Sequence, residues 1–347
     1  MNNQARPTLF YLDFLRCIAA FAVVAIHVLG PFRYLYGEIL DSQWFAATAI
    51  NAMSRWAVPA FIMISGALLL SSERPFNAED YVIKRVARVV IPFFAWSLIY
   101  AFAAGFIVND EITGSWSMGE SIKVIEQSNE TPVWYHLWFF YDFIPLYFVI
   151  PFLIPVLKKA TPALIKGLMV IWMVLFLMTW LNVEHFLLQN VILYTGYLLF
   201  GWYLFNRDNS AQLKYWVIMG IFMLVINIGG SWWLAIETGY YSSFFMGYKT
   251  LNTVIITGML FVLAQRYAGN IQGKLRVLIS VIAKYSLGIY LLHPLLLIPV
   301  RHLDNGYYSW FISNWLAIPV ITLFIVFLSL LFTVFLTKIP LIKRIVP

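Results

Sequence analysis

The hydrophobic positions of this chain form long, nearly continuous apolar runs separated by short polar segments. Residues 14–29 and 318–335 are examples, and they lack the alternation of apolar and polar positions that membrane-spanning strands require. We therefore expect helices. Because about twenty apolar residues cross a bilayer as a helix, the runs predict ten spans, at 9–30, 45–70, 86–108, 134–157, 163–181, 189–205, 214–235, 247–266, 278–300 and 311–336.

The predicted fold is all-α, a polytopic transmembrane helix bundle in which residues 1–347 form a single integral-membrane domain without a separate soluble domain. The longest loop covers only about 109–133. We expect the second run to begin as an interfacial helix around Trp44 and to cross from about Asn51. The first run is interrupted by Asp13 and Arg16 and is followed by no small-residue cleavage site, so we expect it to be retained rather than removed as a signal peptide.

Composition excludes the soluble and disordered classes. Of the 347 residues, 62% are hydrophobic and only 11% are charged, which is far outside soluble usage. The lone cysteine, Cys17, cannot form an internal disulfide, and no Cys/His spacing resembles a zinc or iron–sulfur site, so we expect no metal. The net charge of +7 is spread over short loops, and we therefore expect no nucleic-acid partner.

The basic residues indicate an orientation, because Lys and Arg resist translocation far more than acidic residues do. With a cytoplasmic N-terminus, 18 of the 23 lie on the cytoplasmic side, and the outer side receives only Arg33, Arg55, Lys123, Lys249 and Arg301. The long loop at about 109–133, which lies on the outer side in this orientation, is acidic. Both termini are then cytoplasmic, which requires an even number of spans.

Ionisable residues within spans are costly unless they face the bundle interior or water, so each is a candidate functional residue. Arg16 and His27 are eleven residues apart in the first run, which places them on one helical face with an offset of about 20° and an axial separation of roughly 16 Å. Asp13 can pair with Arg16 at i, i+3. The structural alternative is that Arg16 anchors the helix at the interface and His27 bonds a carbonyl.

A second cluster precedes Pro92 at the cytoplasmic entry of the third run. Arg85 and Arg88 are expected on one helical face, where two guanidinium groups form a fork suited to phosphates. Positive-inside anchoring is the alternative explanation for both.

Further polar residues occupy the outer halves of other runs. Arg55 lies about a turn below the surface, and Asp142 is expected about 9 Å deeper than His136. Aromatic-belt anchoring explains the tryptophans of the fourth run but neither His136 nor Asp142. In the ninth run, Ser286, Tyr290 and His293 follow an i, i+4, i+7 spacing on one face, for which a structural hydrogen bond between helices is the alternative.

These motifs together resemble the membrane-bound acyltransferase family 3, and the resemblance covers essentially the whole chain. The motifs that carry it are Leu12-Asp13-Phe14-Leu15-Arg16 followed by His27 after ten intervening residues, Met63-Ile64-Ser65-Gly66, Arg85-x-x-Arg88, His136-Leu137-Trp138-Phe139-Phe140 and Ser286-Leu287-Gly288-Ile289-Tyr290-Leu291-Leu292-His293. Within the family, the stretch from Ser54 to Gly66 and the His136 motif look most like inner-membrane O-acetyltransferases of surface polysaccharides, including the enterobacterial common antigen. Asp142 is not part of the family pattern.

The resemblance implies acyl transfer, with acetyl as the expected group, from cytoplasmic acyl-CoA to a hydroxyl of a surface glycan or lipid-linked sugar at the outer face of a bacterial inner membrane. The partners are acyl-CoA, the glycan and the bilayer, and no cofactor is tightly bound. Arg85 and Arg88, with Arg16, are expected to bind the CoA phosphates.

The pantetheine arm is expected to rise along the first span, so that the thioester reaches the outer half of the bundle. His27 would be the general base, or would form an acyl-imidazole. Arg55 or His136 would stabilise the oxyanion. Asp13, Trp138, Asp142, Ser286, Tyr290 and His293 are the candidate substrate-contacting or positioning residues.

A secondary transporter for an anionic solute is the competing function, since ten spans with internal prolines and buried basic residues also suit one. Transporters commonly show inverted repeats and polar residues at the bilayer midplane. This chain shows no repeat, and its polar residues collect at the two ends of the spans. The sequence names neither the sugar nor the hydroxyl.

Overall fold

The protein is a bundle of helices in a computed structural model that describes residues 9–72, 75–108, 111–183, 189–302, 311 and 313–346. The helices are α1 Phe10–Val28, α2 Asp41–Ser54, α3 Ala57–Leu70, α4 Ala78–Arg85, α5 Ile91–Ala104, α6 Met118–Glu126, α7 Trp138–Lys159, α8 Pro162–Trp180, α9 Asn190–Phe205, α10 Leu213–Thr238, α11 Leu251–Tyr267, α12 Gly273–Lys284, α13 Ser286–His302 and α14 Asn314–Leu336. A short antiparallel pair, β1 Ile107–Val108 and β2 Glu111–Ile112, lies between α5 and α6.

The expected bundle of apolar helices is confirmed, with three of the ten expected spans differing in form. Eight helical stretches of the described chain are long and apolar enough to cross a membrane. The expected span at 278–300 is a broken one, because α12 and α13 meet at an angle of 71° around Tyr285. The expected span at 189–205 is α9, whose 16 residues fall short of the length of the other spans.

The second expected span is also divided, since α2 and α3 are separated by a turn at Arg55 and Trp56. Trp44, around which the interfacial helix is expected, lies in α2. It is fully buried in the protein, and its indole Nε1 donates to the carbonyl oxygen of Arg33 at 2.9 Å.

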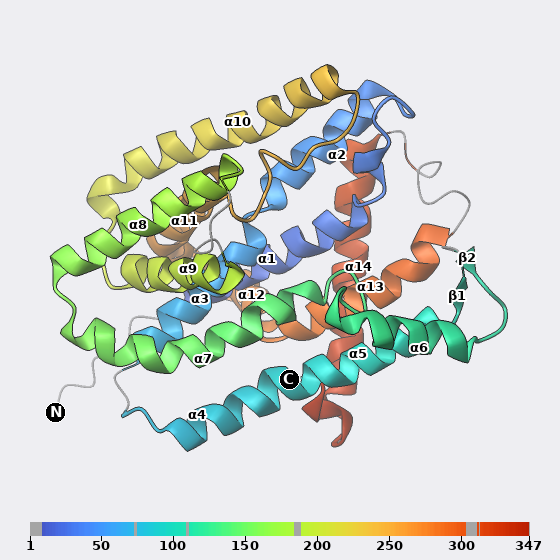
Figure 1. Cartoon of the computed structure of the whole chain (residues 1–347), viewed down its shortest axis with the longest axis horizontal. Coiled ribbons are helices and arrows are strands. Elements are labelled where there is room, and N and C mark those ends of the chain that lie inside the picture. The colour runs from blue at the N-terminus through green and yellow to red at the C-terminus, as the bar shows by residue number, and fades with distance from the viewer. Residues whose placement is uncertain are drawn as a thin grey trace.

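Helix α1 lies inside the bundle, where it contacts α2, α3, α11, α12, α13 and α14. In the most apolar 18-residue stretch of α1, 61% of the residues are buried in the protein. In the corresponding stretches of α8 and α10, only 11% and 17% are buried. In Figure 1, α8 and α10 lie along one side of the molecule, and the turn from α7 to α8 lies at the opposite end from α6, β1 and β2. The exposed apolar helices are suited to lipid, whereas α1, which carries Arg16 and His27, is largely enclosed by other helices.

Helices α3 and α9 approach each other through glycines. A Cβ atom at Gly66 would lie 2.0 Å from the carbonyl oxygen of Leu198, and one at Gly201 would lie 2.1 Å from that of Met63. Small residues allow such backbone contact between membrane helices. This contact fixes α3, which forms one wall of the cavity described below.

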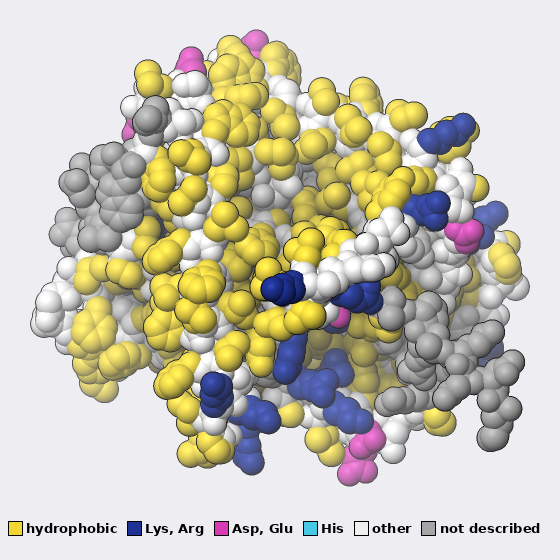
Figure 2. All heavy atoms as spheres, turned by 180° about the vertical axis from the view of Figure 1, so that it is seen from behind, with side chains coloured by type: hydrophobic (Ala, Val, Ile, Leu, Met, Phe, Trp, Pro, Cys, Tyr) yellow, Lys and Arg dark blue, Asp and Glu magenta, His cyan; other side chains and the backbone are white. Residues whose placement is uncertain are grey.

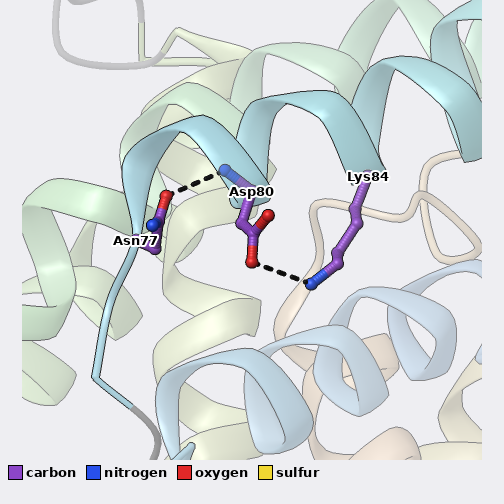
Figure 3. Close-up of polar contacts among 3 residues, drawn as sticks. All are labelled: Asn77, Asp80 and Lys84. Carbon is purple, nitrogen blue, oxygen red and sulfur yellow. Dashed lines mark hydrogen bonds and ion pairs between the residues drawn. The ribbon is translucent and has the colours of Figure 1, made fainter.

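The segment before α5 is not a regular α-helix. The side chain of Asn77 caps α4 by accepting from the backbone N–H of Asp80 at 2.9 Å, and Lys84 pairs with Asp80 at 3.4 Å (Figure 3). A π-helix over Val86–Val90 then separates α4 from α5. It changes the angular relation that the sequence predicted between Arg85 and Arg88.

Charge is distributed unevenly over the surface. Figure 2 shows Lys and Arg side chains gathered along the lower and right-hand parts of one face, beside a broad hydrophobic area. The right-hand edge of that view corresponds to the left-hand end of Figure 1, where α7 ends and α8 begins.

Candidate active site

Three histidines from distant parts of the sequence meet inside the bundle. His27 lies in the last turn of α1, His136 just before α7, and His293 in α13. The ring centroids of His27 and His293 are 5.1 Å apart, and those of His293 and His136 are 5.7 Å apart. His136 and His293 are fully buried, and His27 is half-buried. A substrate therefore reaches His27 first.

Hydrogen bonding assigns the free nitrogen of His293. Its Nδ1 lies 3.2 Å from the carbonyl oxygen of Ile289, and because a carbonyl only accepts, Nδ1 carries the proton in the neutral ring. The buried Nε2 then holds a lone pair and has no partner among the described residues. Both ring nitrogens of His136 are likewise buried without a described partner. A buried polar atom without a hydrogen-bond partner costs free energy, and a ligand that forms the missing hydrogen bond would offset this cost.

Tyr290 holds the segment that carries His136. Its hydroxyl donates to the backbone carbonyl oxygen of His136, and the two rings lie 5.2 Å apart. The ring of Tyr100 also lies close, 4.8 Å from that of His136, and its hydroxyl donates to the carbonyl oxygen of Leu291 at 2.6 Å. Helices α5, α7 and α13 are thus joined at His136.

A cavity of ≈ 110 Å³ lies between Arg16 of α1 and Tyr290 of α13, and no histidine is among the described residues that line it. Arg16 and Val23 of α1 form one side, and Ser286 and Tyr290 of α13 form another. The remaining lining is mostly apolar and comes from α3 and α7: Val58, Phe61, Ile64, Ser65, Phe139 and Phe143, with Leu287 from α13. The cavity therefore runs from Arg16 to Tyr290, whose ring lies 5.2 Å from that of His136 and 5.9 Å from that of His293.

Arg16 is paired as the sequence suggested. Its Nη1 lies 3.3 Å from Oδ1 of Asp13, and both side chains are about one-third exposed, at 30% and 38%. The charge is partly neutralised, but the guanidinium still borders the cavity.

Arg85 and Arg88 have different environments. The Arg85 guanidinium lies 5.6 Å from the ring centre of Tyr81 and 5.4 Å from that of Tyr147, on α7. Arg88, in the π-helix, is exposed. Only Arg85 is therefore held in a defined position by aromatic rings.

Arg55 belongs to a neighbouring cluster. Its guanidinium lies 5.1 Å from the ring centre of Tyr248 and interacts electrostatically with Tyr248 and Tyr241. The ring of Tyr248 also stacks on that of Trp138, with centroids 5.2 Å apart. Trp138 thus positions Tyr248, which in turn positions Arg55. The His136 motif alone did not reveal this relationship.

Asp142 is tied to the same cluster by a hydrogen-bond chain. Asn190 Nδ2 donates to Asp142 Oδ1 at 2.8 Å, and Lys249 Nζ donates to Asn190 Oδ1 at 2.9 Å. Lys249 follows Tyr248 directly in the sequence. Asp142 therefore anchors the segment that carries Tyr248.

Sequence reasoning missed two residues at the site. The ring of Tyr135 lies 5.0 Å from that of His27, and Arg301 Nη2 donates to the backbone carbonyl oxygen of His27 at 2.5 Å. Tyr135 was indistinguishable from an aromatic-belt residue and Arg301 from an interfacial anchor. The only available signal was that Arg301 is one of the five basic residues that the charge distribution places on the outer side of the membrane.

Comparison with protein families gives one match, to the acyltransferase domain of acyltransferase family 3, over residues 9–334. The match spans nearly the whole chain and confirms the family resemblance of the motifs. It favours membrane acyl transfer over the transporter alternative. Comparisons with curated proteins and with solved structures gave no match.

Proposed function

The chain belongs to acyltransferase family 3, and from this premise we propose that it transfers an acetyl group from cytoplasmic acetyl-CoA to a hydroxyl of a surface glycan or lipid-linked sugar at the outer face of a bacterial inner membrane. The observation that carries this proposal is the cavity between Arg16 and Tyr290, because it joins a basic residue near the start of α1 to a tyrosine whose ring lies beside those of His136 and His293.

The donor is proposed to enter from the end of the bundle where α1 begins. Arg85 is the best-placed cation for the CoA phosphates, because the rings of Tyr81 and Tyr147 limit its motion and a guanidinium binds phosphate through two parallel hydrogen bonds. Arg16 supplies a second positive charge at the cavity. The exposed Arg88 contributes through its charge alone.

The pantetheine arm is placed along this cavity, which must widen to admit it because ≈ 110 Å³ is below the usual range of ligand pockets, about 300–1,000 Å³. The thioester then lies beside the histidines. The mostly apolar lining of the cavity suits an uncharged chain, and Ser65, Ser286 and Tyr290 offer hydrogen bonds to the amides of the arm. The roughly 16 Å between Arg16 and His27 along α1 is within the reach of such an arm.

In the chemical step, His27 removes the proton from the sugar hydroxyl, and the hydroxyl oxygen attacks the thioester carbonyl carbon. A tetrahedral intermediate forms. Its collapse restores the carbonyl, breaks the carbon–sulfur bond and releases the CoA thiolate, which takes the proton from His27. An acyl group carried first on His27 is the variant with a covalent intermediate.

Two side chains are candidates for the oxyanion. His136 is the nearer to the other histidines and has ring nitrogens with no described partner, so a protonated nitrogen there is free to donate. Arg55 is held by Tyr241 and Tyr248 instead. We assign the oxyanion to His136 and the binding of the acceptor to the Arg55 cluster.

The test is an assay of the purified chain with acetyl-CoA labelled in the acetyl group and lipid-linked glycans isolated from the native membranes. The proposal expects label to appear on the glycan and free CoA to form in equal amount. A folded protein that binds acetyl-CoA but neither hydrolyses it nor transfers its acetyl group to any glycan would contradict the proposal.

A further inference from the structure

Two arginines beside the histidine cluster have no part in the proposed reaction. Arg301, near the end of α13, donates to the carbonyl oxygen of His27 and lies 5.0 Å from the ring centre of Tyr135. Arg33 follows α1 and lies 4.8 Å from the ring centre of Tyr34. Both contribute to the electrostatic potential at His27. The acceptor hydroxyl must come to this same position.

No acidic residue in the described part of the chain pairs with either of these arginines. Among the described residues, the ion pairs are Arg16–Asp13, Lys84–Asp80 and Lys123–Glu120, and none involves Arg33 or Arg301. The Nε atom of each is buried without a described hydrogen-bond partner. A half-buried guanidinium loses part of its hydration, and without a counter-ion nothing offsets that loss. An anionic ligand would supply the missing opposite charge.

Arg301 also lines an open cavity of ≈ 540 Å³ beside α6. This volume is within the usual range of ligand pockets, about 300–1,000 Å³. Trp134 and Tyr135 contribute aromatic rings to its wall, and Glu120 and Lys123 contribute charges that pair with each other at 3.6 Å. Arg301 is thus the one unbalanced charge among the described residues of this lining, and it connects the cavity to His27.

We propose that the acceptor carries an anionic group, a carboxylate or a phosphate, close to the hydroxyl that is acetylated, and that Arg301 binds this group with Arg33 as a second positive charge. This inference rests on the proposed acyl transfer and adds the chemical class of its acceptor. Arginine suits the role because its planar fork matches both anions with two hydrogen bonds.

The experiment measures transfer to native lipid-linked glycans before and after their charge is removed. Amidation of sugar carboxylates with a carbodiimide and an amine neutralises the first source of charge, and mild acid removes the lipid diphosphate, which is the second. One treatment should lower kcat/KM at least about tenfold, and which one does so identifies the anion. If neither treatment changes kcat/KM, the inference is wrong.

Variants show whether the arginines recognise this charge. Arg301→Gln should raise KM for the native acceptor at least about tenfold, with a smaller rise for Arg33→Gln, and neither should add a comparable loss for the neutralised acceptor. Arg301→Lys should restore part of the affinity. Equal losses with charged and neutral acceptors would mean that the arginines are structural, and would overturn the inference.

Arg276→Gln is the matched control, because it removes the same charge from a guanidinium that lies 3.9 Å from the ring centre of Phe10, at the other end of α1. It should leave the acceptor KM unchanged. Failure of the proposed function is separately visible: acetyl transfer that ignores acceptor charge overturns only this inference, whereas absence of any acetyl transfer overturns both.

Discussion

The ring of His27 lies 5.1 Å from the ring of His293, although the two residues come from the first and the second-to-last of the long helices. His293 donates through Nδ1 to the carbonyl oxygen of Ile289, so its lone pair is on Nε2. His27 is the more accessible of the two. Because of this difference in exposure, His27 is the residue suited to proton transfer with a substrate, and His293 is its buried neighbour.

Arg85 is predicted to contribute more to donor binding than Arg88. Arg85→Gln should raise the Kd for acetyl-CoA at least about tenfold, because it removes a guanidinium held between Tyr81 and Tyr147, and Arg88→Gln should have a smaller effect. Arg85→Lys should rescue only in part. Titration of the purified variants with acetyl-CoA measures this.

The control for that titration is Lys84→Gln, which removes a neighbouring positive charge that Asp80 already pairs (Figure 3). Its Kd should stay close to that of the unmodified protein. Equal losses for Arg85, Arg88 and Lys84 would indicate a general effect of charge at this end of the bundle, with no specific phosphate contact.

Asp142 is predicted to act through Asn190. Asp142→Ala and Asn190→Ala should each lower kcat/KM about tenfold, because each breaks the chain that anchors Lys249 and its neighbour Tyr248. The double variant should lose no more than either single variant, since both changes remove one connection. Losses that multiply in the double variant would contradict this role and would assign Asp142 a separate contact.

The contact between α3 and α9 should depend on the absence of a side chain at Gly66. Gly66→Ala places a Cβ atom 2.0 Å from a backbone carbonyl oxygen, so we expect a loss of at least about 2 kcal/mol in stability. Gly167→Ala is the matched control in α8, because nothing lies within 4 Å of a Cβ atom there. Thermal unfolding in detergent distinguishes the two, and equal stability would contradict the packing.

The orientation predicts which loops face the outside. A cysteine at Ser115, in the loop before α6, should react with a membrane-impermeant maleimide in intact cells. A cysteine at Ser210, before α10, should react only after the membrane is opened. The native Cys17 is buried and should give no background. Reversed labelling would exchange the donor and acceptor sides.

The sequence predicted the helical fold well because long apolar runs have few alternatives in a bilayer. It did not predict the bend at Tyr285 or the π-helix over Val86–Val90, because neither interrupts the run of apolar residues from which the spans were predicted. The pairing of Asp13 with Arg16 was predictable because it is local to one helix.

The site was predictable only in part. Motif spacing identified His27, His136 and His293 individually, but their meeting requires α1, α7 and α13 to pack together, which no local pattern encodes. Arg301 was missed for the same reason, because its contact with the His27 carbonyl joins residues far apart in the sequence.

The most direct test of the account is the acetyl transfer rate of His27→Ala, measured in the same preparation as its affinity for acetyl-CoA. The account predicts that transfer falls at least about a hundredfold while the Kd for acetyl-CoA changes little, because the role assigned to His27 is in proton transfer. His136→Ala and His293→Ala should be less severe. A folded His27→Ala protein that binds acetyl-CoA and transfers acetyl at nearly the unmodified rate would contradict it, and His136 would then become the candidate base.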